Sequence, residues 1–159
     1  VIEILNKYKD KIIAVRGNCD SEVDQMVLSY PIMSDYSMIY LGNKRVFLTH
    51  GHIYNIDNPL PMSEGDILLY GHFHIPMIEK KGERYFFNPG SISLPKNNSN
   101  HSFAILDETK FQIKDLDENI LEKLSKDLTE CALKCADLDH KMQCIKKSIE
   151  ENSLNRRGK

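Results

Sequence analysis

The chain has 159 residues and a formal net charge of −2, with 41% hydrophobic and 28% charged residues. This length predicts about one domain, and the composition is ordinary for a globular protein. The near-neutral charge excludes a strongly basic nucleic-acid binder, and no apolar run approaches the roughly 18 residues that a membrane helix needs.

The composition changes along the chain. Every aromatic residue and every proline lies within residues 1–111, whereas residues 115–159 contain no aromatic, no proline and one glycine, Gly158. This shift predicts two parts: a mixed domain over residues 1–114 and a charged, amphipathic helical extension over residues 115–159.

The first elements read as a helix followed by a strand. Ile2, Leu5 and Tyr8 share one helical face, and the apolar run over residues 12–16 is typical of a parallel strand buried on both faces. A helix that leads into such a strand is the second half of a βαβ unit. Because the first strand of that unit is missing and Val1 stands where a methionine would begin a chain, we expect a protein that lacks its N-terminal part.

The next elements are short. A helix is expected over residues 22–29, with Asp20 or Ser21 as its N-cap. Turn signals then predict three hairpins, two of them with a glycine in the turn, and a buried run predicts one further strand. Their ranges are 37–41 with 44–49, 77–80 with 84–88, 103–106 with 111–114, and 66–70. The pattern indicates a layered α/β fold.

Polar motifs follow four of the predicted strands. They are Gly17-Asn18-Cys19-Asp20, His50-Gly51-His52, Gly71-His72-Phe73-His74 and Asn88-Pro89-Gly90-Ser91. In open α/β folds, ligands bind at the carboxyl ends of strands. Each His-x-His pair can point to one side of an extended segment, and imidazole and amide groups bind transition metals. Taken singly, these motifs are also common as turns, helix caps and hydrogen-bonded pairs, but their combination favours a metal site.

The four motifs, in this order and spacing, resemble those of the calcineurin-like metallophosphoesterases. The stretch from Val15 to Met26 resembles the YfcE-type phosphodiesterase branch in particular. The resemblance covers residues 1 to about 114. It implies a β-sandwich of two mixed sheets flanked by helices, here N-terminally incomplete and followed by a C-terminal helix. It also implies hydrolysis of phosphodiesters by a metal-bridging hydroxide, with two divalent ions, of which manganese is preferred over iron, nickel or zinc.

The resemblance also assigns the candidate site residues. Asn18, His50 and His72 would bind the second metal, and His74 would bind the first. Cys19 stands where many relatives have a histidine that contacts the scissile phosphate or the leaving group. His52 would position His50 or bound solvent. The turn Asn88–Ser91 is expected to pack beneath the site without a chemical role.

One departure from the family affects the expected activity. The Asp-x-His and Gly-Asp motifs that supply carboxylate ligands in the family do not occur at the corresponding positions, because the single Gly-Asp pair, Gly65-Asp66, precedes a later strand. We therefore expect little or no activity from this chain. The alternative is a non-catalytic fragment with a vestigial metal pocket and a helix for assembly or partner binding.

The predicted helical extension carries an apolar seam at heptad spacing. Its residues are Leu128, Cys131, Cys135, Leu138, Met142, Ile145 and Ile149. It is typical of a helix that packs on its own domain, although dimerisation or docking on a partner stays open. A zinc site formed by Cys131, Cys135, His140 and Cys144 is disfavoured, since one helix cannot bring all four residues together.

The remaining expectations concern partners and location. A small phosphodiester is the expected substrate, neither a membrane nor a nucleic acid is expected as a partner, and a homo-oligomer could form through the C-terminal helix. Four cysteines and a first segment unlike a secretory signal favour the cytoplasm.

Overall fold

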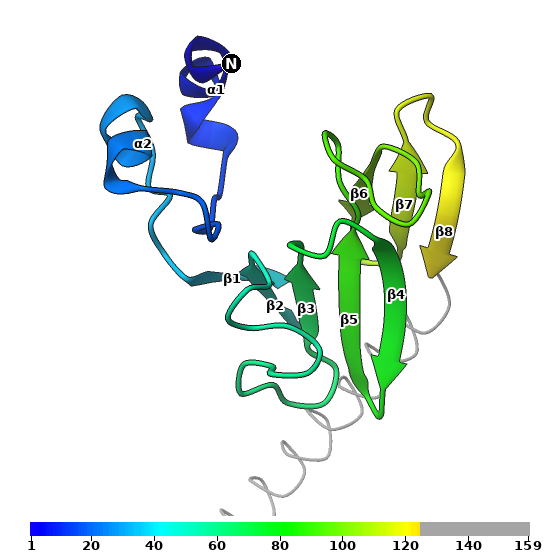
Figure 1. Ribbon diagram of the computed structural model, residues 1–159. Helices are drawn as coiled ribbons and strands as arrows, with labels where there is room; N and C mark the ends of the chain where they lie inside the picture. The colour runs from blue at the N-terminus through cyan, green and yellow to red at the C-terminus, as the bar shows by residue number, and fades with distance from the viewer. Residues whose placement is uncertain (125–159) are drawn as a thin grey trace, which may run out of the picture.

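The computed structural model describes residues 1–124, which form two packed β-sheets and short helices (Figure 1). The helical elements are α1 (Ile2–Lys7), a 3₁₀ turn (Lys9–Lys11) and α2 (Glu22–Val27). The strands are β1 (Tyr36–Leu41), β2 (Lys44–Thr49), β3 (Ile67–Tyr70), β4 (Pro76–Lys81), β5 (Arg84–Pro89), β6 (Ser102–Leu106), β7 (Phe111–Asp115) and β8 (Ile120–Leu124).

The larger sheet has the strand order β1-β2-β3-β5-β4. Its three central strands, β2, β3 and β5, are parallel, and each edge strand is the antiparallel partner of its neighbour in a hairpin. The smaller sheet, β6-β7-β8, is antiparallel throughout. The expectation of two mixed sheets is therefore wrong for the smaller one. Short turns connect its strands, and a short turn can join only antiparallel neighbours.

The apolar runs of the central strands are buried on both faces, as the sequence predicts. Side chains alternate along a strand, so each strand supplies two clusters. One cluster lies between the sheets and consists of Val46, Ile67, Tyr85, Phe87, Phe111 and Ile113. The other lies beneath the long connection between β2 and β3 and consists of Phe47, Leu60, Met62, Leu68, Tyr70 and Phe86.

The segment 12–16, predicted to be a buried strand, is not one. Arg16 N–H donates to the Ser34 carbonyl at 2.8 Å, but no ladder forms along this segment in the described part of the chain. Ile13 is 58% exposed. An apolar run becomes a strand only when a neighbouring strand satisfies its backbone groups, and the described residues provide none here.

The two helices lie near β1 and do not cover the faces of the sheets (Figure 1). Asn6 holds them together, because its amide donates to the Val27 carbonyl and accepts from Ser29 N–H. α2 begins at the predicted place, with Ser21 as N-cap and a capping box completed by Asp24. Among residues 1–124, no helix has the length and apolar content needed to span a membrane.

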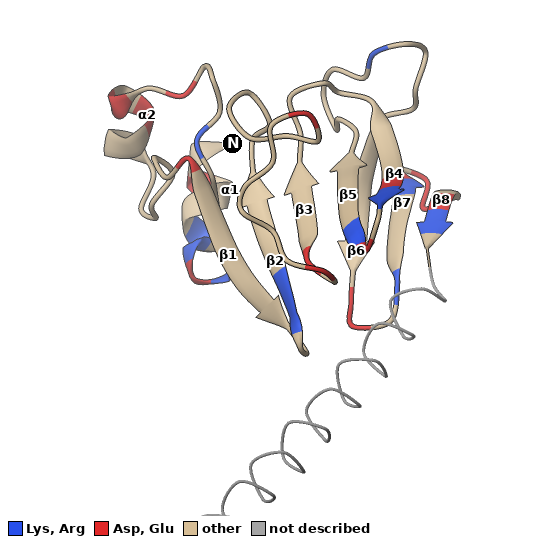
Figure 2. Cartoon of the chain, turned by 90° about the horizontal axis from the view of Figure 1, so that it is seen from below, with Lys and Arg blue, Asp and Glu red and all other residues tan. Residues whose placement is uncertain are grey.

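At its described end, the chain departs from the helix predicted there. Residues 120–124 form strand β8 and pair with β7, whereas the sequence predicted a helix from residue 115 onwards. Leu124 is the one partly buried residue of β8 and packs against the core between the sheets, while backbone pairing with β7 holds the rest of the strand. The rest of the predicted helix, including its heptad seam and the cysteines considered for zinc, lies outside the described residues. Figure 2 shows acidic and basic residues dispersed around the coloured part of the chain.

Candidate metal centre

Parallel pairing brings the polar motifs to one edge of the larger sheet. In the register, Thr49 lies opposite Tyr70 and Leu69 lies opposite Phe87. The residues that follow β2 and β3 therefore lie side by side, as expected for the carboxyl ends of parallel strands.

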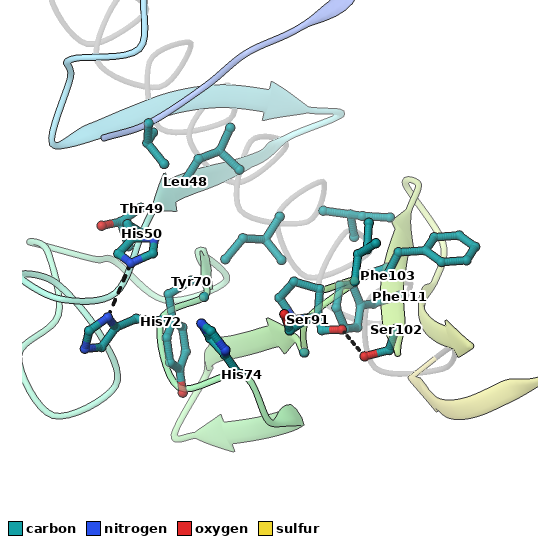
Figure 3. A pocket seen from close by; sticks show the side chains of 18 of the residues that line it. Leu48, Thr49, His50, Tyr70, His72, His74, Ser91, Ser102, Phe103 and Phe111 are labelled. Carbon is teal, nitrogen blue, oxygen red and sulfur yellow. Dashed lines mark hydrogen bonds between the residues drawn. The ribbon is translucent and has the colours of Figure 1, made fainter. Parts of the chain in front are cut away.

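Three of the predicted metal ligands converge. His50 Nε2 lies 2.9 Å from Asn18 Oδ1 and 3.3 Å from His72 Nδ1. Figure 3 shows the rings of His50 and His72 pointing toward one another. The structure thus brings Asn18, His50 and His72 together, although they are far apart in the sequence.

His52 and His74 occupy different places around this cluster. The His52 ring centroid is 5.2 Å from that of His50 and 6.2 Å from that of His72, and its Nδ1 is buried without a hydrogen-bond partner. His74 lies on the other side of Tyr70 from His72 in Figure 3. Its Nδ1 is 2.6 Å from the Leu94 carbonyl, so Nδ1 carries the proton and Nε2 is the atom left to bind a ligand.

The remaining predicted residues of the first loop lie beside the cluster. Cys19 is exposed and unpaired, and its Sγ accepts a 3.4 Å hydrogen bond from the Asn18 amide. Asp20 is not the helix cap that the sequence allowed. Its carboxylate accepts from Gly17 N–H at 2.6 Å and closes the loop on itself.

Burial and nearby side chains shift the pKa of His50. Burial lowers the pKa of the His50 imidazole, and the neighbouring His72, His52 and His74 lower it further, against an opposing effect of Asp20. The neutral imidazole is the form that binds a metal, so the environment favours the binding form.

The donor set is neutral. Among residues 1–124, no three histidine, cysteine, aspartate or glutamate side chains converge as a metal-binding group. The third donor of the cluster is the amide oxygen of Asn18. Neutral imidazole and amide donors fit a first-row divalent ion, although they do not offset its charge.

The histidines line a pocket of about 560 Å³ that extends between the two sheets. His50, His72 and His74 contribute polar atoms, and Leu48 and Phe111 belong to its apolar walls. This volume lies in the range of small-molecule sites, about 300–1,000 Å³.

Sequence reasoning missed two features of the site. Gly51 has φ +109°, and a Cβ there would lie 2.9 Å from the Gly71 carbonyl oxygen, so only glycine permits the close approach of the two histidine loops. Asn88, predicted to pack beneath the site without a chemical role, donates from its buried amide to the same carbonyl at 2.9 Å. The sequence did contain a signal for the bond from Asn88, because asparagine side chains in turns commonly hydrogen-bond nearby backbone groups.

Comparison with known proteins agrees with this arrangement. The calcineurin-like phosphoesterase superfamily domain matches residues 1–110. The chain belongs to this superfamily. It is 44% identical to the phosphodiesterase YfcE of Escherichia coli K12 over 126 residues, which cover 79% of this chain and 68% of the relative.

A solved structure and a second relative support the assignment. A solved structure of E. coli YfcE, described as a phosphoesterase, superposes with a TM-score of 0.75 at 42% identity, covering 78% of this chain and 69% of that one. The probable metallophosphoesterase YsnB of Bacillus subtilis 168 is 31% identical over 99 residues, which cover 58% of this chain and 54% of the relative. The superfamily consists of hydrolytic phosphoesterases, and it implies divalent metal ions as cofactors.

Proposed function

We propose that this superfamily member is a metal-dependent phosphodiesterase whose metal centre includes Asn18, His50 and His72. The observation that carries the proposal is the convergence of Asn18 Oδ1, His50 Nε2 and His72 Nδ1 within 2.9 and 3.3 Å. These contacts are hydrogen bonds from His50 to Asn18 and to His72, and the two imidazole nitrogens and the amide oxygen that they join are atoms of the kind that bind a divalent transition-metal ion.

The spacing fits a bound ion. Metal–nitrogen and metal–oxygen distances of about 2.1 Å place neighbouring ligand atoms about 3.0–3.4 Å apart, depending on the coordination geometry. The two separations in this cluster lie near or within that range. The buried, unpartnered Nδ1 of His52 adds a polar atom beside the cluster that a bound solvent molecule would satisfy.

The ions, when bound, supply positive charge for the phosphate oxygens and lower the pKa of attacking water. The protein residues hold the parts in place. His50 and His72 offer their imidazole nitrogens, while the Leu94 carbonyl orients His74 so that its Nε2 faces away from the hydrogen bond. Cys19 lies exposed beside Asn18, where it can contact a bound phosphoester or its leaving group.

The neutral donor set leads us to propose weak activity and weak metal binding for this chain, with manganese as the first ion to test. In the described residues, no carboxylate joins Asn18, His50 and His72 to offset two divalent charges. A small phosphodiester is the proposed substrate, since the pocket has the size of a small-molecule site. The relatives favour this function over the non-catalytic alternative.

Hydrolysis of bis-p-nitrophenyl phosphate, followed by p-nitrophenolate absorbance with and without Mn²⁺, tests the proposal. We expect slow turnover that requires Mn²⁺ and that falls at least 100-fold in His72→Ala, because the ion loses a ligand. His101→Ala is the matched control, since His101 binds the Ile92 carbonyl outside the cluster. Turnover that is indifferent to Mn²⁺ and to His72→Ala would contradict the proposal.

A further inference from the structure

His72 has an unusual backbone conformation. Its φ is +66°, a region that residues other than glycine seldom adopt. Phe73 N–H donates to the Gly71 carbonyl at 2.8 Å, across His72. A hydrogen bond between residues two apart, with positive φ at the residue between them, defines the rare and strained form of the γ-turn.

A strained turn persists only when its surroundings hold it. Three hydrogen bonds meet at Gly71 in addition to its chain connections. Its N–H donates to the His50 carbonyl at 2.9 Å, and its carbonyl accepts from Phe73 N–H and from the Asn88 side-chain amide. Gly71 is thereby held at both its N–H and its carbonyl. These bonds also fix the position of the His72 backbone, from which the side chain projects.

Asn88 has the features of a residue built for this contact. It is 1% exposed, and both ends of its amide are used. Nδ2 donates to the Gly71 carbonyl at 2.9 Å, and Oδ1 accepts from Gly90 N–H at 3.0 Å. Asn88 therefore joins the loop that carries His72 to the turn after β5.

The turn after β5 is itself anchored to the smaller sheet. Ser102, at the start of β6, donates from Oγ to the Pro89 carbonyl at 2.8 Å, and its N–H donates to the Ser91 carbonyl at 3.0 Å. Figure 3 shows Ser102 bonded to this turn at the far side of the pocket from His50. The His72 turn is thus connected through Asn88 to both sheets.

We infer that Asn88 is a positioning residue that holds the His72 γ-turn and so sets the separation between His72 Nδ1 and His50 Nε2. The inference rests on the proposed function, because it assigns metal affinity as the consequence of this separation. Asn88 does not line the pocket, and it acts through the Gly71 carbonyl.

The test compares Asn88→Ala with Ser102→Ala. Asn88→Ala removes the bond to Gly71, whereas Ser102→Ala removes a buried hydrogen bond on the other side of the same turn and leaves Asn88 in place. Three quantities are measured in each variant. Mn²⁺ affinity comes from the electron paramagnetic resonance signal of free Mn²⁺, the opening of the turn from amide hydrogen exchange at Gly71 and Phe73, and stability from unfolding in urea.

Asn88→Ala is expected to weaken Mn²⁺ binding about tenfold or more and to speed amide exchange at Gly71 and Phe73. Ser102→Ala should change both by less than about twofold although it also lowers stability. Mn²⁺ affinity and exchange in Asn88→Ala equal to wild type would overturn the inference, as would equal losses in the two variants.

The measurements also separate the possible failures. If wild type binds no Mn²⁺, the proposed function fails, and the exchange rates still decide whether Asn88 holds the turn. If Asn88→Ala does not fold, hydrogen exchange of the Asn88 side-chain amide is measured in wild type instead. Slow exchange of one Nδ2 proton supports the contact with Gly71, and exchange at the rate of an exposed amide overturns it.

Discussion

At the scale of single residues, the site depends on how closely two loops can approach. Gly51 and Gly71 lie in contact, and this contact brings His50 and His72 within reach of one another. The sequence shows the glycines only as parts of two His-containing motifs. Their steric role follows from the tertiary contact, where a side chain on Gly51 would meet backbone that cannot move aside.

Gly51→Ala is expected to lower the free energy of unfolding by about 1–3 kcal/mol and to reduce Mn²⁺-dependent turnover. Its Cβ would lie 2.9 Å from the Gly71 carbonyl oxygen and 3.1 Å from His72 Cβ, at a residue with φ +109°. Urea unfolding and the hydrolysis assay measure the two effects.

Gly82→Ala is the control for that prediction. Gly82 also has positive φ, +61°, but a Cβ there would have nothing within 4 Å. The Gly82→Ala variant should lose only the free energy of unfolding that the positive φ costs an alanine, and it should keep full turnover. A Gly51→Ala protein as active as Gly82→Ala would show that the close approach does not matter for the site.

At the scale of elements, the β7–β8 hairpin is the part of the fold that sequence periodicity missed. Asp115 shapes its turn. Oδ1 accepts from the N–H groups of Asp117 and Asn119, and Oδ2 accepts from the Asn119 amide. These bonds, chiefly the one from the Asn119 side chain, lower the pKa of Asp115 below its usual 3.8. A carboxylate that closes a turn in this way favours a hairpin over a continuing helix.

Asp115→Ala is expected to lower the free energy of unfolding at pH 7. A carboxyl whose pKa is depressed in the folded protein stabilises the fold above its unfolded pKa of 3.8, and this stabilisation is lost as the pH falls through the folded value. The difference between wild type and variant should therefore shrink in acid. Urea unfolding at several pH values, with an NMR titration of the carboxyl, measures it.

Asp117→Ala serves as the comparison at the hairpin, because Asp117 contributes its backbone N–H to this turn. We expect its stability to follow that of wild type at every pH. A difference between Asp115→Ala and wild type that stays constant down to the acid limit would rule out the carboxylate as the stabilising group.

At the scale of the whole molecule, the two sheets share one core. Phe87 of the larger sheet and Phe111 of the smaller sheet stack with ring centroids 4.1 Å apart and an interplanar angle of 13°, and both are fully buried. Phe111 also belongs to the wall of the pocket. The core that joins the sheets therefore also supports the cavity in front of the histidines.

Phe111→Ala is expected to cost about 3–5 kcal/mol in the free energy of unfolding, with both sheets unfolding in one transition. Circular dichroism and tyrosine fluorescence during urea unfolding should report the same midpoint. Ile105→Ala, at a residue 38% exposed on β6, should cost less than about 1 kcal/mol. Separate midpoints for the two probes would show that the sheets are independent units.

The sequence by itself determined the central strands, the three hairpins β1–β2, β4–β5 and β6–β7, and the identity of the cluster residues. Consecutive apolar residues marked β2, β3 and β5 because both faces of these strands are buried, and the Gly42-Asn43 turn marked the hairpin of β1 and β2. Motifs at strand ends marked Asn18, His50 and His72. Each of these signals is local, so neighbouring residues suffice to carry it.

Only the tertiary structure decided the remainder. Segment 12–16 has the apolar run of a strand but lacks a ladder partner in the described chain, and residues 120–124 join a sheet in spite of a helical spacing. The γ-turn at His72 and the bond from Asn88 depend on loops that are distant in sequence. Backbone pairing and close packing form between segments that are distant in the sequence. The residue pattern of one segment therefore does not show which other segment it will pair with or pack against.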